Sequence, residues 1–345
     1  MENRIALYPI PGIAQGWDDE PFDLSALPAT IVSNVTVEDI LSFLNEDAFD
    51  WLKGEMGRYD LDAMRSIRYA IVHRYQPKTI DIAGESDQNA EALVRNLSAC
   101  IRLIRPMRQR ASFVRGVVQS DGRLQVGHFE HPSDLMEVPN VQKLFVLRNR
   151  DLDHFKKVGR DFLRAMEGEF WKFRLAVQFH EAGHFSHLYW KGRFSLWCSA
   201  VEALFTSNTK DHRGSLVAKE RIKWFLGAST SIYAPGDFPS SSLEVQPTIT
   251  IGDVIDDLYE LRNCVAHGDK TPDSFFKEKR SGLDQSVTLV EVLHEAISFI
   301  IRASLLRILD ENLLSHFANG PASESYFGGY DLTHSALKAQ RAIKP

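Results

Sequence analysis

Residues 250–268 read TIGDVIDDLYELRNCVAHG, and this stretch decides how the second half of the chain is interpreted. Thr250 is a typical helix N-cap and Gly268 a typical helix stop, so the spacing predicts a helix that starts near Gly252 and ends at Gly268. The apolar residues of this helix recur at helical spacing on one face: Val254, Ile255, Leu258, Leu261 and Val265. A helix with such a face packs against other helices.

Helical periodicity extends in both directions from this stretch. Long helices are predicted over 153–190, with a break near Gly168 or Gly183, and over 194–205, 215–226 and 287–317. We therefore interpret residues 151–320 as an all-α helical bundle and residues 321–345 as a short, polar C-terminal tail.

The first 150 residues have a mixed character. Helices are predicted over 36–54, 61–75 and 87–104, and Pro106 prevents the last one from continuing. The period then changes to two: residues 112–119 and 123–129 flank a turn at Asp121-Gly122, which is typical of a β-hairpin, and 141–147 predicts a further strand. Residues 1–150 are therefore predicted to form a mixed α/β domain, and the whole chain belongs to the α+β class.

The composition excludes several classes of protein. The chain has 345 residues, of which 44% are hydrophobic and 25% are charged, as in ordinary globular proteins. No segment predicts a membrane span, and Met1–Gly16 does not have the apolar core of an export signal. The three cysteines, Cys100, Cys198 and Cys264, are far apart, which suits reduced thiols. We expect a cytoplasmic protein without a membrane partner.

The end of the quoted stretch carries an R-x4-H motif, from Arg262 to His267. The guanidinium of Arg262 is a planar fork of donors that matches a phosphate, and Asn263 adds a neutral donor and acceptor. An imidazole titrates near neutral pH, so His267 can accept or donate a proton. These are the side chains that metal-free phosphodiester cleavage requires. Residues five apart lie about 140° apart around a helix, so one copy presents the pair poorly to one phosphate, and a homodimer is expected.

Two segments together resemble the HEPN superfamily, in particular its ApeA-like branch: LRNCVAHG at 261–268 and LWCSAVEALF at 196–205. The resemblance covers roughly residues 153–318. It implies a helical bundle, usually dimeric, and a metal-independent ribonuclease of a toxin–antitoxin or anti-phage system, with an antitoxin or defence protein as partner. Carried over by position, Arg262 and His267 are the catalytic pair, Asn263 is the polar residue beside the arginine, and Glu202 matches an acidic position in the earlier helix.

A second motif competes with the first. Residues 180–184 read HEAGH, which would place His180 and His184 on one helix face to bind zinc, with Glu181 acting on its water. A catalytic zinc needs a third protein ligand. His187, three residues along the same helix, would give poor tetrahedral geometry, and Glu202, which lies about where a third ligand is expected, is part of the segment SAVEALF at 199–205. We therefore predict no metal, and we interpret the histidines as part of a partly polar bundle face. No glycine-rich phosphate loop is present, so no nucleotide cofactor is expected.

The net charge is −6, but residues 95–160 carry 13 Lys and Arg against 6 Asp and Glu. The densest basic block is predicted to bind RNA through its backbone phosphates, with a solvated surface as the alternative: Arg102, Arg105, Arg108, Arg110 and Arg115. Trp171, Trp190, Trp197 and Trp224 are expected in the bundle core.

Three hypotheses about function follow. The first is a metal-independent endoribonuclease that cleaves RNA by attack of the ribose 2′-hydroxyl. The second is a zinc metalloprotease that uses His180, Glu181 and His184. The third is a HEPN module that binds RNA or a protein partner without catalysis, because the family includes inactive members. Metal content separates the second hypothesis from the first, and cleavage in the presence of a chelator separates the first from the third.

Overall fold

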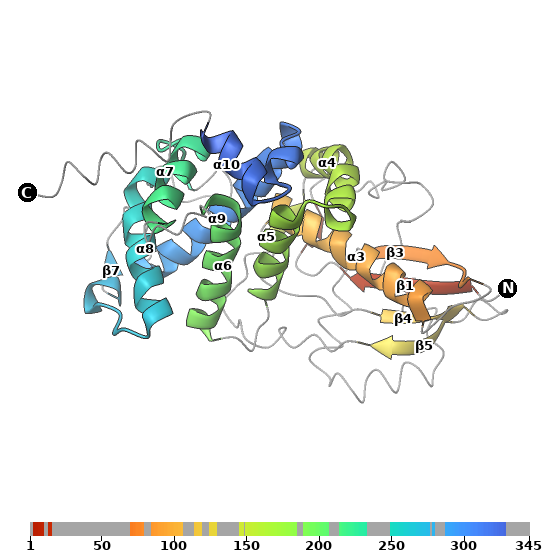
Figure 1. Ribbon diagram of the computed structural model, residues 1–345. Helices are drawn as coiled ribbons and strands as arrows, with labels where there is room; N and C mark the ends of the chain where they lie inside the picture. The colour runs from red at the N-terminus through yellow and green to blue at the C-terminus, as the bar shows by residue number, and fades with distance from the viewer. Residues whose placement is uncertain are drawn as a thin grey trace, which may run out of the picture. The chain divides into compact units, whose positions relative to one another are not determined.

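The computed structural model describes residues 3–9, 13–15, 70–78, 84–105, 114–118, 124–129, 145–147, 149–184, 189–206, 214–232, 249–276, 278–279 and 287–328. The chain divides into two compact units. Unit 1 comprises Met1–Arg164 and His184–His187, and unit 2 comprises Ala165–Gly183 and Leu188–Pro345. An antiparallel sheet in unit 1 and many helices in unit 2 make this an α+β protein (Figure 1).

Unit 1 is built on a four-stranded antiparallel sheet with the strand order β3-β1-β4-β5. Its strands are β1 (Asn3–Pro9), β3 (Ala70–Tyr75), β4 (Val114–Val118) and β5 (Leu124–Phe129). The pairing of β4 with β5 confirms the predicted hairpin, and a β-bulge lies between Arg115 and Gly116. Helix α3 (Glu85–Ile104) packs against β1 and β3 and ends before Pro106, as predicted.

The predicted helix over 61–75 is wrong for its last six residues, because Ala70–Tyr75 is strand β3. This segment pairs antiparallel with β1, so that Val72 lies opposite Leu7. Ile71 and Val72 are β-branched and almost fully buried, which suits a pleated surface covered by a helix. Pairing with a distant strand therefore outweighs the helical spacing of the apolar residues. The predicted helix over 36–54 lies outside the described residues.

The remaining elements of unit 1 are short strands and one long helix. Strand β2 (Ile13–Gln15) pairs in parallel with β6 (Phe145–Leu147), within the predicted strand over 141–147. Helix α4 (Asn149–Glu167) follows, and the chain passes from unit 1 to unit 2 at Arg164 within it. The sequence analysis places the domain boundary earlier, at residue 150.

Unit 2 is mainly helical. Its elements are α5 (Trp171–Ala182), α6 (Trp190–Phe205), α7 (Gly214–Leu226), α8 (Ile251–His267), η2 (Asp273–Phe276), β7 (Glu278–Lys279), β8 (Val287–Thr288), α9 (Leu289–Asp310), η3 (Leu314–Phe317) and α10 (Gly320–Gly328). The predicted helices over 194–205, 215–226 and 252–268 are confirmed. The predicted interruption near Gly168 is also confirmed, because it separates α4 from α5.

Helix α9 lies at the centre of unit 2 and packs against α5, α6, α7 and α8. Its fully buried apolar residues cover about half of the helix circumference: Leu293, Ala296, Ile297, Ile300, Ile301, Leu305 and Ile308. An apolar face of this width lets the helix pack against several neighbours at once. Among the described residues, none of the helices combines the length and apolar character that crossing a membrane would need.

The sequence analysis assigns residues from 321 onward to a tail, but residues 320–328 form helix α10. Phe327 is fully buried, and its ring lies near Phe205, Phe225 and Phe317, with centroid distances of 5.9 to 6.4 Å. A large aromatic side chain that loses all contact with water stabilises the docked helix by a few kcal/mol, on the order of 2. This burial explains why a short polar segment is ordered.

Candidate functional site

The R-x4-H motif lies in the last turns of α8, as the sequence predicts. The helix begins with a capping box in which Thr250 and Asp253 exchange hydrogen bonds, and it ends at Gly268, which has a φ of 72°. Because only glycine adopts this left-handed conformation without strain, Gly268 sets the position at which the helix ends. Leu258 and Leu261 are buried in the core, Arg262 lies half-buried at the edge of the same face, and His267 is exposed on the opposite side of the helix.

Arg262 pairs with Glu202 of helix α6. Its Nε donates a hydrogen bond to Glu202 Oε1 at 2.7 Å, and Nη2 lies 2.7 Å from the same oxygen. Nη1 donates to Asn263 Oδ1 at 3.2 Å. Both members of the ion pair are about a quarter exposed, at 27% and 26%. The structure therefore brings together three of the four residues that the resemblance implies, at a point that solvent can reach.

Two buried groups lie behind this ion pair. Burial raises the pKa of the Cys198 thiol, and the negative charge of Glu202 raises it further. Burial also raises the pKa of the Tyr259 hydroxyl well above its ordinary value, again with a contribution from Glu202. Both groups are therefore protonated at neutral pH, and Cys198 cannot act as a thiolate nucleophile. Because these neutral, buried groups lower the local dielectric constant, they strengthen the attraction between Glu202 and Arg262.

His267 is the last residue of α8, and it is exposed. His267 lies five residues beyond Arg262 in continuous α-helix, which places it about 7.5 Å further along the axis and about 140° around it. A single copy of the chain therefore presents a guanidinium and an imidazole to solvent in different directions.

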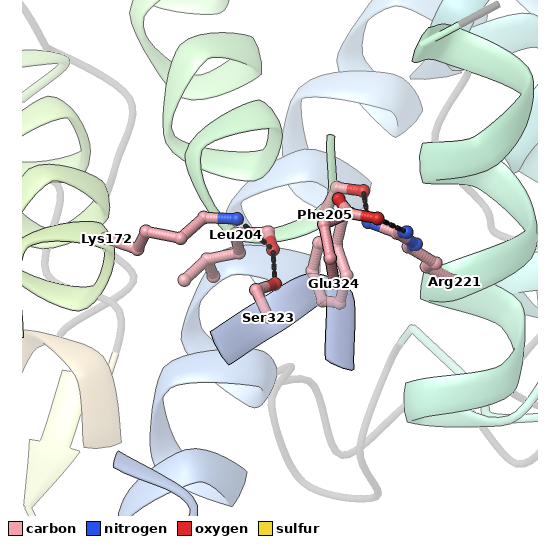
Figure 2. A network of polar contacts seen from close by, with 6 residues as sticks. All are labelled: Lys172, Leu204, Phe205, Arg221, Ser323 and Glu324. Atoms are coloured by element: carbon pink, nitrogen blue, oxygen red, sulfur yellow. Dashed lines mark hydrogen bonds and ion pairs between the residues drawn. The ribbon is translucent and has the colours of Figure 1, made fainter. Parts of the chain in front are cut away.

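The end of α6 is held by side chains from three other helices (Figure 2). The carbonyl oxygen of Leu204 accepts hydrogen bonds from Lys172 Nζ of α5 at 3.3 Å and from Ser323 Oγ of α10 at 3.5 Å. The carbonyl oxygen of Phe205 accepts one from Arg221 Nη1 of α7 at 3.3 Å. The last carbonyl groups of a helix have no partner within it, and cations interact favourably with this end of the helix dipole. The network therefore fixes the helical turn that carries the acidic partner of Arg262.

Within this network, Arg221 has no exposed surface, and Glu324 of α10 neutralises its charge. Nη1 and Nη2 donate to the two carboxylate oxygens at 3.0 and 2.7 Å, which is the bidentate geometry that an arginine favours. The guanidinium carbon also lies 4.7 Å from the centroid of the Phe327 ring. These contacts attach α10 to α7 and to the core.

Lys172 is only 4% exposed. Burial lowers the pKa of its ammonium group to about 8, and the nearby positive charge of Arg221 lowers it further, while Glu324 acts in the opposite direction. The sequence pattern does not reveal this network, because its members come from four helices that are distant in the sequence. Two features of the sequence are consistent with the helix that carries Ser323 and Glu324: Pro321 near its start and the aromatic residues that follow.

The first histidine of the competing HEAGH motif, His180, has a place in the packing of unit 2. His180 is fully buried in unit 2, with Nδ1 3.5 Å from Glu181 Oε1, and its backbone carbonyl accepts a hydrogen bond from Trp197 Nε1 at 3.1 Å. A Cβ at Gly183 would overlap the Trp197 indole, so glycine is required for α5 and α6 to pack closely. His180, Glu181 and His184 form a group of potential metal-ligating side chains. The division between the units separates His184 from the other two, and we assign no metal to the group.

The predicted basic strip needs correction. Arg102 is 1% exposed and Arg105 9% exposed, so neither presents its charge to a nucleic acid. Arg105 Nε donates to Asp151 Oδ2 at 2.7 Å. These two arginines lie near the end of α3 and are buried by the packing of unit 1, which the sequence pattern alone did not reveal. Arg108 and Arg110 lie outside the described residues.

Arg115, the last member of the basic block, lies on β4 with Nε 3.7 Å from Asp87 Oδ2. Asp87 also accepts hydrogen bonds from Arg4 Nη1 at 2.9 Å and from the Tyr75 hydroxyl at 2.6 Å. Although burial raises the pKa of Asp87, the hydrogen bonds from Tyr75 and Arg4 and the charge of Arg115 lower it overall. Arg115 therefore helps to neutralise the negative charge of Asp87 within unit 1.

Comparison with known proteins gave no match to any family model, curated protein or solved structure. The candidate site therefore rests on its own geometry and on the motif resemblance.

Proposed function

We propose that this chain is a HEPN-type endoribonuclease that cleaves RNA without a metal ion. The observation that carries the proposal is the contact of Arg262 with Glu202 and Asn263, at a solvent-accessible point on α6 and α8, in the same helix as an exposed His267. Sequence resemblance names these four residues, and the packing of α6 against α8 independently brings Glu202 into contact with Arg262. As the resemblance implies, the proposed role of this enzyme is in a toxin or anti-phage system.

The chemistry assigns one task to each side chain. His267 removes the proton from the ribose 2′-hydroxyl, whose oxygen then attacks the adjacent phosphorus. Arg262 stabilises the negative charge that develops on the phosphoryl oxygens. The bond from phosphorus to the 5′-oxygen breaks, and that oxygen takes a proton from a second imidazole. The products are a 2′,3′-cyclic phosphate and a 5′-hydroxyl. Glu202 acts by orienting Arg262, because it occupies the Nε side of the guanidinium and leaves Nη1 toward Asn263.

The second imidazole would come from a second copy of the chain. One α8 helix presents Arg262 and His267 in different directions, whereas two antiparallel copies around a two-fold axis would surround one phosphate with two of each. Both residues reach solvent, as a composite site requires. The proposed enzyme is therefore a homodimer, or an assembly of dimers, with α8 near the two-fold axis.

The test is an RNA-cleavage assay with EDTA present. We expect the parent to cleave and His267→Ala to be slower by about 100-fold or more, since that is the usual contribution of a general acid or base. His316→Ala is the matched control, because His316 is an exposed histidine of the same unit outside the proposed site. If His267→Ala cleaves as fast as the parent, the nuclease proposal is wrong.

The second candidate is a non-catalytic HEPN module that binds RNA or a protein partner. The observation that favours it is the closed pair of Glu202 and Arg262, which occupies two of the nitrogen atoms of the guanidinium. Under this alternative the parent binds RNA with the chelator present and leaves it intact.

A further inference from the structure

Unit 2 exposes aromatic side chains at the beginning of α6. Among the described residues, three large hydrophobic side chains are strongly exposed: Trp171 at 42%, Tyr189 at 70% and Phe276 at 48%. Single exposed apolar residues are normal, but Tyr189 and Phe276 both lie against the half-buried Trp190. The sequence analysis places Trp190 in the core, whereas the structure places it in a patch that we call the aromatic platform, formed by Tyr189, Trp190 and Phe276.

The three rings are held at fixed angles. The ring centroids of Tyr189 and Trp190 are 5.8 Å apart with the planes tilted by 50°, and those of Trp190 and Phe276 are 6.2 Å apart at 78°. From the inner side, His294 of α9 lies 5.8 Å from Trp190. The backbone carbonyl of Tyr189 accepts hydrogen bonds from the amides of Gly192 and Arg193, so the chain is ordered here without using the Tyr189 side chain. The platform is therefore a rigid surface with ring faces that reach solvent.

Positive charge adjoins these rings. Lys191 Nζ lies 5.6 Å from the centroid of the Trp190 ring, and Arg193 is half-buried in the same first turn of α6. The nearby Asp273 is already paired with Lys270 at 3.2 Å. Aromatic faces next to lysine and arginine are the combination that holds the stacked bases and the phosphates of a single strand.

The platform lies at the same end of unit 2 as His267. Helices α6 and α8 run in opposite directions, so the start of α6 and the end of α8 are at one end of the bundle (Figure 1). The Glu202–Arg262 contact gives a common reference point for the two helices. Trp190 lies twelve residues before Glu202 on α6, which is about 18 Å toward this end of the bundle. His267 lies five residues after Arg262 on α8, which is about 7.5 Å toward the same end. Trp190 and His267 are therefore separated by roughly 10 Å along the bundle axis, which a short oligonucleotide spans.

We infer that Tyr189, Trp190 and Phe276 form a stacking platform for single-stranded RNA, which positions nucleotides that flank the phosphate at Arg262 and His267. This inference rests on the proposed ribonuclease function and names its substrate class as unpaired RNA, because bases in a duplex do not offer their faces. The adjacent cations and the position at the same end of unit 2 as His267 favour RNA over a protein partner.

The experiment measures binding of a fluorescein-labelled single-stranded RNA 12-mer by anisotropy, with the full chain in a His267→Ala background so that the probe stays intact. Because stacking contributes about 1–3 kcal/mol per base, Tyr189→Ala and Phe276→Ala should each raise the Kd by about 5- to 100-fold. Tyr189→Phe should bind as tightly as the parent, because it keeps the ring. Trp171→Ala is the matched control, since it removes an exposed ring elsewhere in unit 2 and should leave the Kd unchanged.

Several results would overturn the platform. Unchanged RNA binding by both alanine variants would do so, and if the same variants shift the molecular mass measured by sedimentation, the patch is a protein interface. An equally large loss in Trp171→Ala would also overturn it, since the effect would then not be specific to these rings. The proposed function fails separately: if the alanine variants lose binding but His267→Ala cleaves like the parent in EDTA, the platform stands and the catalytic assignment is wrong.

Discussion

Replacing Lys172 by methionine tests how much the buried charge of this side chain lowers the free energy of unfolding. The side chain is 4% exposed, and burial lowers its pKa from an ordinary value of 10.5 to about 8. A difference of this size corresponds to roughly 3 kcal/mol by which the folded state disfavours the ammonium form. Methionine keeps the unbranched side chain, one atom shorter, and removes the charge.

The sign of the pH dependence follows from the direction of this shift. Below pH 8, Lys172 is charged in both the folded and the unfolded chain, and the full penalty is present. Between about pH 8 and 10.5 the unfolded chain retains the proton that the folded chain has lost, so this group makes the free energy of unfolding rise with pH. Lys172→Met has no such contribution. The free energy of unfolding of Lys172→Met relative to that of the parent should therefore fall by roughly 3 kcal/mol between pH 7.5 and 10.5.

The assay is urea unfolding followed by tryptophan fluorescence at pH 7.5, 8.5, 9.5 and 10.5, for the parent, Lys172→Met and Lys270→Met. Lys270 is the control, because its side chain is 84% exposed and stays in water when the chain folds. Other groups that titrate in this range are common to all three proteins and cancel in the differences. A difference between Lys172→Met and the parent that is constant over the whole range would refute the argument, since Lys172 would then be hydrated.

Two further substitutions test the packing around the site. Glu324→Gln leaves the guanidinium of Arg221 buried without its carboxylate, so the free energy of unfolding should fall by about 3 kcal/mol in urea titrations, and a fall of only a few tenths would show that water replaces the carboxylate. Gly183→Ala places a methyl group in the Trp197 ring and should lower stability by about 1–3 kcal/mol, whereas Gly214→Ala, where nothing lies within 4 Å of the added atom, should not. Equal thermal midpoints for the two alanine variants would contradict the close approach of α5 and α6.

Local patterns predicted the helices of unit 2 because the information lies within each segment. Thr250, the apolar spacing of α8 and Gly268 each act over a few residues, so the start, the buried face and the end of that helix were readable without any tertiary contact. The same holds for the antiparallel pairing of β4 with β5, which the Asp121-Gly122 pair in the sequence between them predicted. Arg262 and His267 could be placed in the last turns of a helix for this reason.

Strand β3 and the arginines of α3 show where local patterns fail. Residues 70–75 have apolar spacing that fits a helix, and only pairing with β1, more than sixty residues away, makes them a strand. Arg102 and Arg105 look like a solvated basic strip in the sequence, and only the packing of unit 1 buries them, with Asp151 as the partner of Arg105. A series of arginines in the sequence does not indicate which of them pair with a carboxylate from a distant part of the chain.

By itself, the sequence determined the helix that carries Arg262 and His267, with its start at Thr250 and its end at Gly268. Tertiary structure alone decided that Glu202 meets Arg262, that Lys172, Arg221 and α10 hold the end of α6, and that the rings at the start of α6 face solvent. The physical reason is range: capping and helical periodicity act between neighbours in the chain, whereas ion pairs and burial depend on segments that folding brings together.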